Sequence, residues 1–218
     1  MGATTKATSG ETSGTDSRQA ILETAARLFR HQGYATTTLR AIAGECGMKA
    51  GSIYYHFASK DEIVSAVLDI GVQRVFDAVR TAVEALPADA GLASTLQCAI
   101  EAHFKALLHA HDFTSANFRI LGQVPEHVRA SHRALRRRYE RYWRDMLLRL
   151  QQRGEIRPGP DLRRTVFYLF GAMNWAAEWY DASKSSLSII AGELAGLVAH
   201  GLHPQPGAAT PLPQGKAP

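Results

Sequence analysis

Glycine and proline residues cut this sequence into pieces of helical length, and their spacing restricts the fold more than any other feature. No piece shows the alternation of apolar and polar residues, rich in Val, Ile and Thr, that is typical of a strand. Apolar residues instead recur at helical spacing between breaks at Gly33, Gly47, Pro87, Gly91, Pro125, Gly154 and the cluster Pro158-Gly159-Pro160. The sequence therefore predicts an all-α protein of about nine helices.

The two ends differ in composition from the rest of the chain. Residues 1–15 are rich in Ser, Thr and Gly, and residues 204–218 are rich in Pro and Gly. Such segments bury too little apolar surface to fold, so we expect both to be disordered tails. The first tail lacks the apolar run of a signal peptide, and no stretch reaches the roughly 18 uncharged apolar residues of a membrane span. We expect a cytoplasmic protein without a membrane partner.

Charge and cysteine content narrow the functional class only slightly. The chain has 25 Lys and Arg against 20 Asp and Glu, a net charge of +5, which mildly favours an anionic partner such as nucleic acid. Its two cysteines, Cys46 and Cys98, lie in apolar helical patterns. This placement predicts free thiols in a reducing compartment.

Motifs for catalysis and for metal binding are missing from the sequence. There is no hydrolytic nucleophile motif, no glycine-rich loop for phosphate and no Cys-x-x-Cys pair. We expect no enzymatic activity and no cofactor. Among the nine histidines, His103, His127 and His132 lack the i, i+4 spacing that lets two rings share a metal. Metal sensing is therefore the weaker alternative, and we predict no metal site.

Three segments near the N-terminus have the pattern of a helix-turn-helix. A helix predicted over residues 18–32 stops at Gly33. A short helix over about 38–46, with Thr37 or Thr38 as N-cap, is followed by Gly47 and by a third helix over about 50–57. Two short helices joined by a turn that contains glycine are typical of this DNA-binding motif.

The stretch "GSIYYHFASKDE", residues 51–62, carries more large side chains than one core can bury. Consecutive helical residues point about 100° apart, so Ile53 and Phe57, one turn apart, face inward while their neighbours face elsewhere. Ser59 and Glu62 then form a capping box that begins a long helix, from Lys60 to about Leu86. The apolar stripe of this helix is long enough to serve two domains and to couple them mechanically.

Residues 21–64, "ILETAARLFRHQGYATTTLRAIAGECGMKAGSIYYHFASKDEIV", resemble the TetR family of bacterial transcriptional regulators. The resemblance implies a homodimer that binds a palindromic double-stranded DNA operator, usually as a repressor, and releases it when a small-molecule effector enters the C-terminal domain. We accordingly expect a DNA-binding domain at 16–62 and a ligand-binding and dimerisation domain at 63–203, between disordered tails at 1–15 and 204–218. A helical adaptor that binds protein through the same N-terminal bundle is the alternative outside the regulator class.

The resemblance also implies which residues contact the operator. They lie at the start of the second helix, along the third and at the start of the fourth: Thr38, Arg40, Lys49, Ala50, Gly51, Ser52, Tyr54, Tyr55, His56 and Lys60. Lys49 departs from the family pattern, in which Ser or Thr is frequent, so it weakens the cap of the third helix and adds a cation able to reach guanine or phosphate. Tyr54 and Tyr55 are expected to donate to phosphate oxygens, with packing at the edge of the bundle as the alternative. Lys60 is expected to meet a phosphate at a helix N-terminus.

A second resemblance concerns the effector. "GAMNWAAEWYD", residues 171–181, resembles the Gly-x-x-Asn-Trp-x-x-x-Trp-Tyr segment of TetR-type regulators of fatty-acid and steroid degradation, whose effectors are acyl-CoA thioesters. An acyl chain needs an apolar tunnel and coenzyme A needs cations, either from Arg119 or from the arginines at 129–144, which otherwise form a solvated face. The expected ligand-binding residues are Phe104, Leu107, Leu108, Phe118, Arg119, Leu121, Tyr142, Phe170, Asn174 and Trp175. Plain core packing is the favoured explanation for each apolar member taken singly, and an unrelated hydrophobic or aromatic effector is the alternative.

Two C-terminal segments are expected to form the subunit interface. Residues 166–179 are apolar nearly all the way round, and residues 189–198 place two glycines one turn apart. Each segment can therefore pack with one side on its own domain and with the other on a second subunit. The expected interface residues are Phe167, Gly171, Trp179, Ile189, Gly192 and Gly196.

Overall fold

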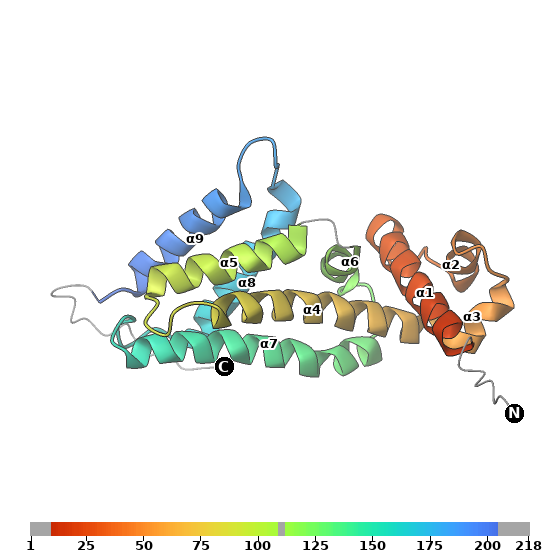
Figure 1. Cartoon of the computed structure of the whole chain (residues 1–218), viewed down its shortest axis with the longest axis horizontal. Helices are drawn as coiled ribbons and strands as arrows, with labels where there is room; N and C mark the ends of the chain where they lie inside the picture. The colour runs from red at the N-terminus through yellow and green to blue at the C-terminus, as the bar shows by residue number, and fades with distance from the viewer. Residues whose placement is uncertain (1–9, 109–111, 205–218) are drawn as a thin grey trace, which may run out of the picture. The chain divides into compact units, whose positions relative to one another are not determined.

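The computed structural model describes residues 10–108 and 112–204, without the side chains of residues 10–15 and of Phe118. Over these ranges the chain forms nine helices and no strand (Figure 1). The helices are α1 (Gly10–Gln32), α2 (Leu39–Glu45), α3 (Ala50–His56), α4 (Lys60–Glu84), α5 (Leu92–Leu108), α6 (Asp112–Ile120), α7 (Glu126–Gln152), α8 (Leu162–Trp179) and α9 (Leu187–Leu202). The predicted all-α fold is thus confirmed for the described residues. None of these helices is both long and apolar enough to cross a bilayer.

Helix α1 begins earlier than the sequence pattern predicts. It starts at Gly10, inside the segment 1–15 for which the composition predicts disorder. Once the packed face of Ile21 and Leu22 fixes the helix, each further residue adds a backbone hydrogen bond at small cost. The remaining tail predictions, for residues 1–9 and 205–218, lie outside the described residues.

The chain divides into two compact units that are discontinuous in sequence. One comprises the described parts of Met1–Val72 and His111–Arg133, and the other those of Gln73–Ala110 and Ala134–Pro218. Two of the three boundaries fall inside helices, in α4 and in α7. The predicted division after residue 62 is a division by function and stays a prediction.

The first unit has a core that combines the N-terminal helices with α6. Helix α1 packs against α6 and α2, and α2 packs against α3. The largest members of this core include Phe29, Ile53, Phe57 and Leu68, and α6 contributes Phe113. The three-helix bundle predicted from the sequence is therefore completed by a helix that begins about 55 residues after it ends.

The second unit is built around α5, which packs against α8 and α9 (Figure 1). Leu96, Ile100 and Phe104 of α5 are fully or almost fully buried, as is Trp143 of α7. These side chains line one face of each helix, because residues three or four apart lie one above the other.

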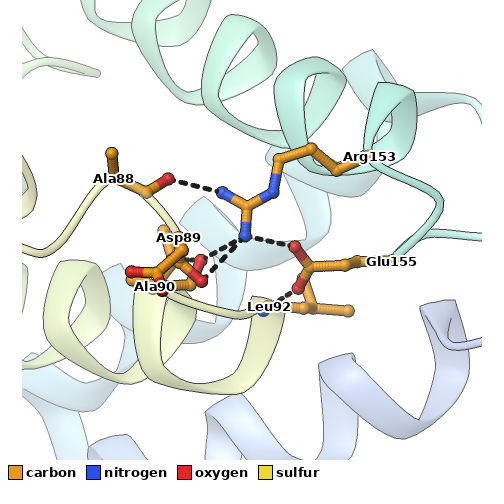
Figure 2. Close-up of polar contacts among 7 residues, drawn as sticks. Ala88, Asp89, Ala90, Leu92, Arg153 and Glu155 are labelled. Atoms are coloured by element: carbon orange, nitrogen blue, oxygen red, sulfur yellow. Dashed lines mark hydrogen bonds and ion pairs between the residues drawn. The ribbon is translucent and has the colours of Figure 1, made fainter.

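A polar clamp at the end of α7 fixes the start of α5 (Figure 2). The guanidinium of Arg153 donates to the carbonyls of residues 88–90, at 2.9 to 3.1 Å, and forms an ion pair with Glu155 at 2.5 Å. The other carboxylate oxygen of Glu155 accepts from the backbone N–H of Leu92, at 2.5 Å. Gly154 joins the two charged residues with φ +78°, a conformation that favours glycine. The clamp thus satisfies backbone groups of the α4–α5 loop and of the first turn of α5.

Candidate nucleic-acid interface and interior polar cluster

Local hydrogen bonds fix the turn between α2 and α3. Thr38 caps α2 by accepting from the N–H of Ala41 at 3.1 Å, which confirms the predicted cap. Gly47 has φ +67°, and the next residue, Met48, returns a backbone hydrogen bond to Ala43 at 2.9 Å. Lys49 stands at the N-cap of α3 without a side-chain hydrogen bond, as its departure from Ser or Thr predicts. Ile53 is fully buried and holds α3 to the bundle.

The opposite face of α3 is exposed. Tyr54 is 61% exposed and Tyr55 is 88% exposed, so neither ring packs into the edge of the bundle. His56 is half-buried and meets the ring of Tyr55 edge-on, at 5.2 Å between centroids. A Cβ on Gly51 would meet nothing within 4 Å, so the fold of this unit does not itself require glycine there. Arg40, Lys49, Ala50 and Ser52 are exposed on the same motif.

The ammonium of Lys60 is engaged within the protein, while its expected contact with an operator phosphate stays a prediction. Its ammonium donates to the carbonyls of Tyr34 and Thr37, at 2.7 and 2.8 Å, and lies 4.0 Å from the centre of the Tyr34 ring. Burial lowers the pKa of Lys60, and the neighbouring Asp61 opposes that shift. Two of the three ammonium N–H groups therefore hold the loop between α1 and α2. The sequence did not predict these hydrogen bonds, because the spacing of residues near Lys60 does not reveal the path of a loop that lies earlier in the chain.

A polar chain joins this loop to α7 within the first unit. The hydroxyl of Tyr34 donates to Asp61 at 2.6 Å, and His127 lies 2.8 Å from the other oxygen of that carboxylate. Burial and the hydrogen bond to Asp61 raise the pKa of Tyr34 to about 12, and the hydrogen bond from Tyr34 is the main cause that lowers the pKa of Asp61. The backbone N–H of Tyr34 also donates to Gln123 at 3.0 Å. The start of α4, Gln123 and His127 thus together position the loop before α2.

Helix α6 approaches α4 closely in the same unit. A Cβ on Gly71 would lie 2.5 Å from the backbone oxygen of Phe113, so only glycine fits there without a shift. Asn117 donates to the carbonyl of Leu68 at 2.7 Å and lies 3.4 Å from the buried ring of His132. The other nitrogen of that ring lies 2.5 Å from Asp69. The sequence offered one overlooked signal for this contact, a glycine in the middle of an otherwise regular helix.

The second unit contains a buried polar cluster formed by His103, Tyr139 and Asn174, from α5, α7 and α8. The Nδ1 atom of His103 lies 2.9 Å from the hydroxyl of Tyr139, and Nε2 lies 3.4 Å from Oδ1 of Asn174. Because Oδ1 can only accept, Nε2 carries the proton and Nδ1 accepts from the Tyr139 hydroxyl. Burial lowers the pKa of His103 to about 4, against the opposing effect of its hydrogen bond to Asn174. The ring is therefore neutral at physiological pH.

Aromatic rings surround this polar cluster. Phe170 stacks on Tyr139 at 5.2 Å between centroids and meets Trp143 edge-on at 5.9 Å. Phe76 lies 5.3 Å from Tyr139 and 5.4 Å from Tyr142. We call these seven residues the interior cluster: Phe76, His103, Tyr139, Tyr142, Trp143, Phe170 and Asn174.

Two buried polar atoms of the interior cluster lack hydrogen-bond partners in the described part of the chain, the hydroxyl of Tyr142 and the indole N–H of Trp143. Burial raises the pKa of Tyr139. The interaction of the Trp143 N–H with the Tyr139 hydroxyl opposes this rise, although it falls outside ordinary hydrogen-bond geometry. A buried donor without a partner costs about 1–3 kcal/mol.

The predicted ligand-binding residues fall into separate groups. Tyr142, Phe170 and Asn174 meet in the interior cluster, while Phe104 and Leu107 are buried in α5 and Leu108 is half-buried. Trp175 is 61% exposed and so lies outside the buried set. Arg119 and Leu121 belong to the first unit, and the side chain of Phe118 lies outside the described residues. The sequence reasoning missed Phe76, His103, Tyr139 and Trp143, for which the only signal was the i, i+4 spacing of the last two.

Helices α8 and α9 each expose an apolar stripe. Residues of α8 three or four apart share one face, and so do those of α9. We call these residues the exposed stripe: Phe167, Gly171, Trp175 and Trp179 of α8, and Ile189 and Leu197 of α9 together with the half-buried Gly192 and Gly196 beside them. Leu197 is 76% exposed, which is unusual for so large an apolar side chain.

The arginines of α7 are divided between paired and unpaired side chains. Arg129 and Arg133 both pair with Glu126, and Arg144 contacts Asp145 at 3.1 Å. Arg136, Arg137 and Arg141 are exposed and form no ion pair within residues 10–108 and 112–204. Across the same ranges, no three His, Cys, Asp or Glu side chains gather as a metal site would require.

Comparison with known proteins agrees with this arrangement along most of the chain. Residues 21–67 match the family model for bacterial regulatory proteins of the tetR family, and residues 90–202 match the model for a tetracyclin repressor-like C-terminal domain. The HTH-type transcriptional repressor KstR2 of Mycobacterium tuberculosis (strain ATCC 25618 / H37Rv) is 29% identical over 164 residues, which cover 75% of this chain and 80% of that protein.

Two solved structures are similar over most of both chains. The TetR family transcriptional regulator PfmR from Thermus thermophilus has a TM-score of 0.73 and 26% identity, over 86% of this chain and 98% of its own. AibR in complex with isovaleryl coenzyme A and operator DNA has a TM-score of 0.71 and 22% identity, over 84% and 97%. The exposed recognition face of α3, the helical second unit and both family matches lead to one conclusion: the chain belongs to the TetR family and is a DNA-binding transcriptional regulator, not an enzyme.

Proposed function

We propose that this regulator acts as a homodimeric repressor, bound to a palindromic operator until a small-molecule effector enters its second unit. The observation that carries the proposal is the division of α3 into a buried face, held by Ile53, and a face that leaves Tyr54 and Tyr55 in solvent. Such a helix can enter the major groove while the bundle behind it stays intact. The repressor role is supported by the similarity to KstR2.

The operator contacts divide into two kinds. The hydroxyls of Tyr54 and Tyr55 donate to phosphate oxygens, which sets the register on the duplex. Arg40 and Lys49 carry exposed cations at the ends of the motif, and Lys49 reaches a base edge. Lys60 supports the loop before α2 and offers a phosphate only its third N–H.

The remaining residues predicted to contact the operator lie at the start of α2 and along α3. Thr38 caps α2, while Ala50, Gly51, Ser52 and His56 lie on α3 beside the two tyrosines. Their small size, apart from His56, lets a duplex approach closely.

Dimerisation uses the exposed stripe. Trp179 is 54% exposed and Ile189 is 57% exposed, and large apolar side chains gathered in this way mark protein interfaces. Gly192 and Gly196 allow a close approach of a partner helix. A two-fold arrangement would also match the symmetry of a palindromic operator.

The effector class supported best is an acyl-CoA thioester, with an unrelated hydrophobic or aromatic molecule as the alternative. The chain shares its fold with AibR, whose structure holds isovaleryl coenzyme A, and with KstR2, a ketosteroid transcriptional regulator. The interior cluster offers apolar and aromatic walls for an acyl group. The unpaired Arg136, Arg137 and Arg141 offer cations for phosphates.

The experiment is a gel-shift titration with the DNA upstream of the protein's own gene, repeated at rising salt and with acyl-CoA thioesters. Specific binding should weaken steeply with salt, and a thioester should release the DNA. Lys49→Ala should change the preferred bases in a randomised-site selection, whereas Tyr54→Phe should weaken all sequences alike. An absent gel shift, or one that does not depend on salt, would contradict the proposed operator binding. An equal loss of affinity for all sequences in Lys49→Ala would contradict the proposed contact of Lys49 with a base.

Oligomeric state is tested separately by sedimentation. Trp179→Glu places a charge in the exposed stripe and should yield a monomer that binds the operator at least tenfold more weakly, because a half-site lacks the second recognition helix. A dimer that persists in this variant would place the interface elsewhere.

A further inference from the structure

The three arginines of α1 differ in their partners. Arg27 and Arg30 are each paired with a carboxylate, at 2.8 and 3.0 Å. Arg18 is exposed and forms no ion pair with a side chain that the structure describes. Its guanidinium carbon lies instead 4.6 Å from the centre of the Phe57 ring. Among these three arginines, only Arg18 thus keeps a charge that no described carboxylate offsets.

The contact with this ring places Arg18 at the C-terminal end of α3. Phe57 is the C-cap residue of α3 and directly follows His56, one of the residues expected to contact the operator. Because Phe57 is buried and Arg18 is exposed, the arginine covers the ring at the surface of the first unit. The early part of α1 accordingly lies beside α3 (Figure 1).

This geometry suits a phosphate. A guanidinium that lies over a ring uses its flat face, while its N–H groups point outward in its own plane and can hold two oxygens of one phosphate. Helix α3 has seven residues and is about 10 Å long, and the major groove is about 12 Å wide. A cation beside the end of α3 is therefore within reach of the phosphates that border the groove.

We propose that Arg18 is a further operator contact, which binds a phosphate at the edge of the major groove and uses the Phe57 ring as its support. The ring holds the side chain before DNA arrives, which reduces the conformational entropy lost on binding. Since a phosphate is present at every base pair, the contact strengthens binding and sets the register without reading sequence. The inference rests on the proposed operator binding and adds a residue of α1 to it.

The test measures the affinity of the full-length protein as a function of salt, for a duplex that the wild type selects from a randomised library. Arg18→Met keeps an apolar side chain over Phe57 but removes the charge. At about 0.1 M salt it should bind about tenfold more weakly for each chain on the operator, and the salt slope should fall by about one per chain. Base preferences should not change, and binding to a duplex of unrelated sequence should weaken as well.

Arg149→Met provides the matched control. Arg149 is an exposed arginine of α7 in the second unit, so this variant loses the same charge from the other unit. It should keep the affinity and the salt slope of the wild type. The melting temperatures of both variants confirm that they fold.

A wild-type salt slope in Arg18→Met would overturn the inference even if affinity fell, because a loss that is equal at all salt concentrations is structural. Altered base preferences in Arg18→Met, or an equal loss of slope in Arg149→Met, would also overturn it. These three results leave the operator binding of the wild type intact. If the wild type itself showed no salt-dependent binding, the proposed operator binding would be refuted, and the role of Arg18 with it.

Discussion

Acidification should destabilise this protein partly through His103, and the burial of that ring sets the size of the effect. The pKa of His103 falls from 6.5 to about 4 on folding, because burial disfavours the imidazolium. Between these values the unfolded chain binds one more proton than the folded chain, so stability is lost as the pH falls through this window. From about pH 7 to about pH 5, one such group removes about 2 kcal/mol from the free energy of unfolding.

The assay is urea denaturation followed by circular dichroism at both pH values, for the wild type and for His103→Gln. Glutamine keeps an amide in the cluster but does not titrate, so the variant should lose about 2 kcal/mol less than the wild type on acidification. Groups that titrate in both proteins cancel in this difference. Protein concentration is held fixed, because association contributes to apparent stability.

An exposed histidine provides the control. His31→Gln should lose as much stability as the wild type, because the ring lies in solvent. Equal losses in the wild type and in His103→Gln would refute the reasoning, since they would mean that His103 does not change its proton affinity on folding.

Three further predictions concern single contacts. Gly71→Ala should destabilise the fold by about 1–3 kcal/mol in thermal melts, because its Cβ would lie 2.5 Å from a backbone oxygen of α6, whereas Gly44→Ala, with nothing within 4 Å, should not. Arg153→Ala should cost about 1–2 kcal/mol in urea denaturation, because three loop carbonyls lose their donor; an unchanged midpoint would show that the clamp is dispensable. Lys60→Met should lower the melting temperature and leave the salt dependence of operator binding almost unchanged, whereas Arg40→Ala should reduce the salt slope by about one. A reduced slope in Lys60→Met together with an unchanged slope in Arg40→Ala would instead identify Lys60 as a phosphate contact.

Local sequence information was enough for the helices and for the motif that reads DNA. Each of these features involves residues only a few positions apart: the caps at Thr38 and Ser59, the turn at Gly47, and the buried pair Ile53 and Phe57. Such features can be read from spacing because each depends only on residues that are close in the sequence.

The polar contacts between distant segments could not be read in the same way. His103 lies 36 residues before Tyr139 and 71 residues before Asn174 in the chain. No local pattern predicts that these three residues share a core. Lys60 illustrates the same limit on a smaller scale. Its position beside a helix start suggested a phosphate, but a loop 23 to 26 residues earlier supplies the carbonyls that it binds.

The discontinuity of the first unit also affects how the protein can be made. Its core needs Phe113 and Val128 as well as the N-terminal helices, so a ribosome must release the chain well past α6 before this unit can close. The long separation between its two segments should make that closure slow, since distant contacts must overcome a larger loop entropy. For the same reason a fragment that ends after α4 would expose an apolar surface, and a transplant of the DNA-reading part onto another sensor must carry α6 and the beginning of α7 with it.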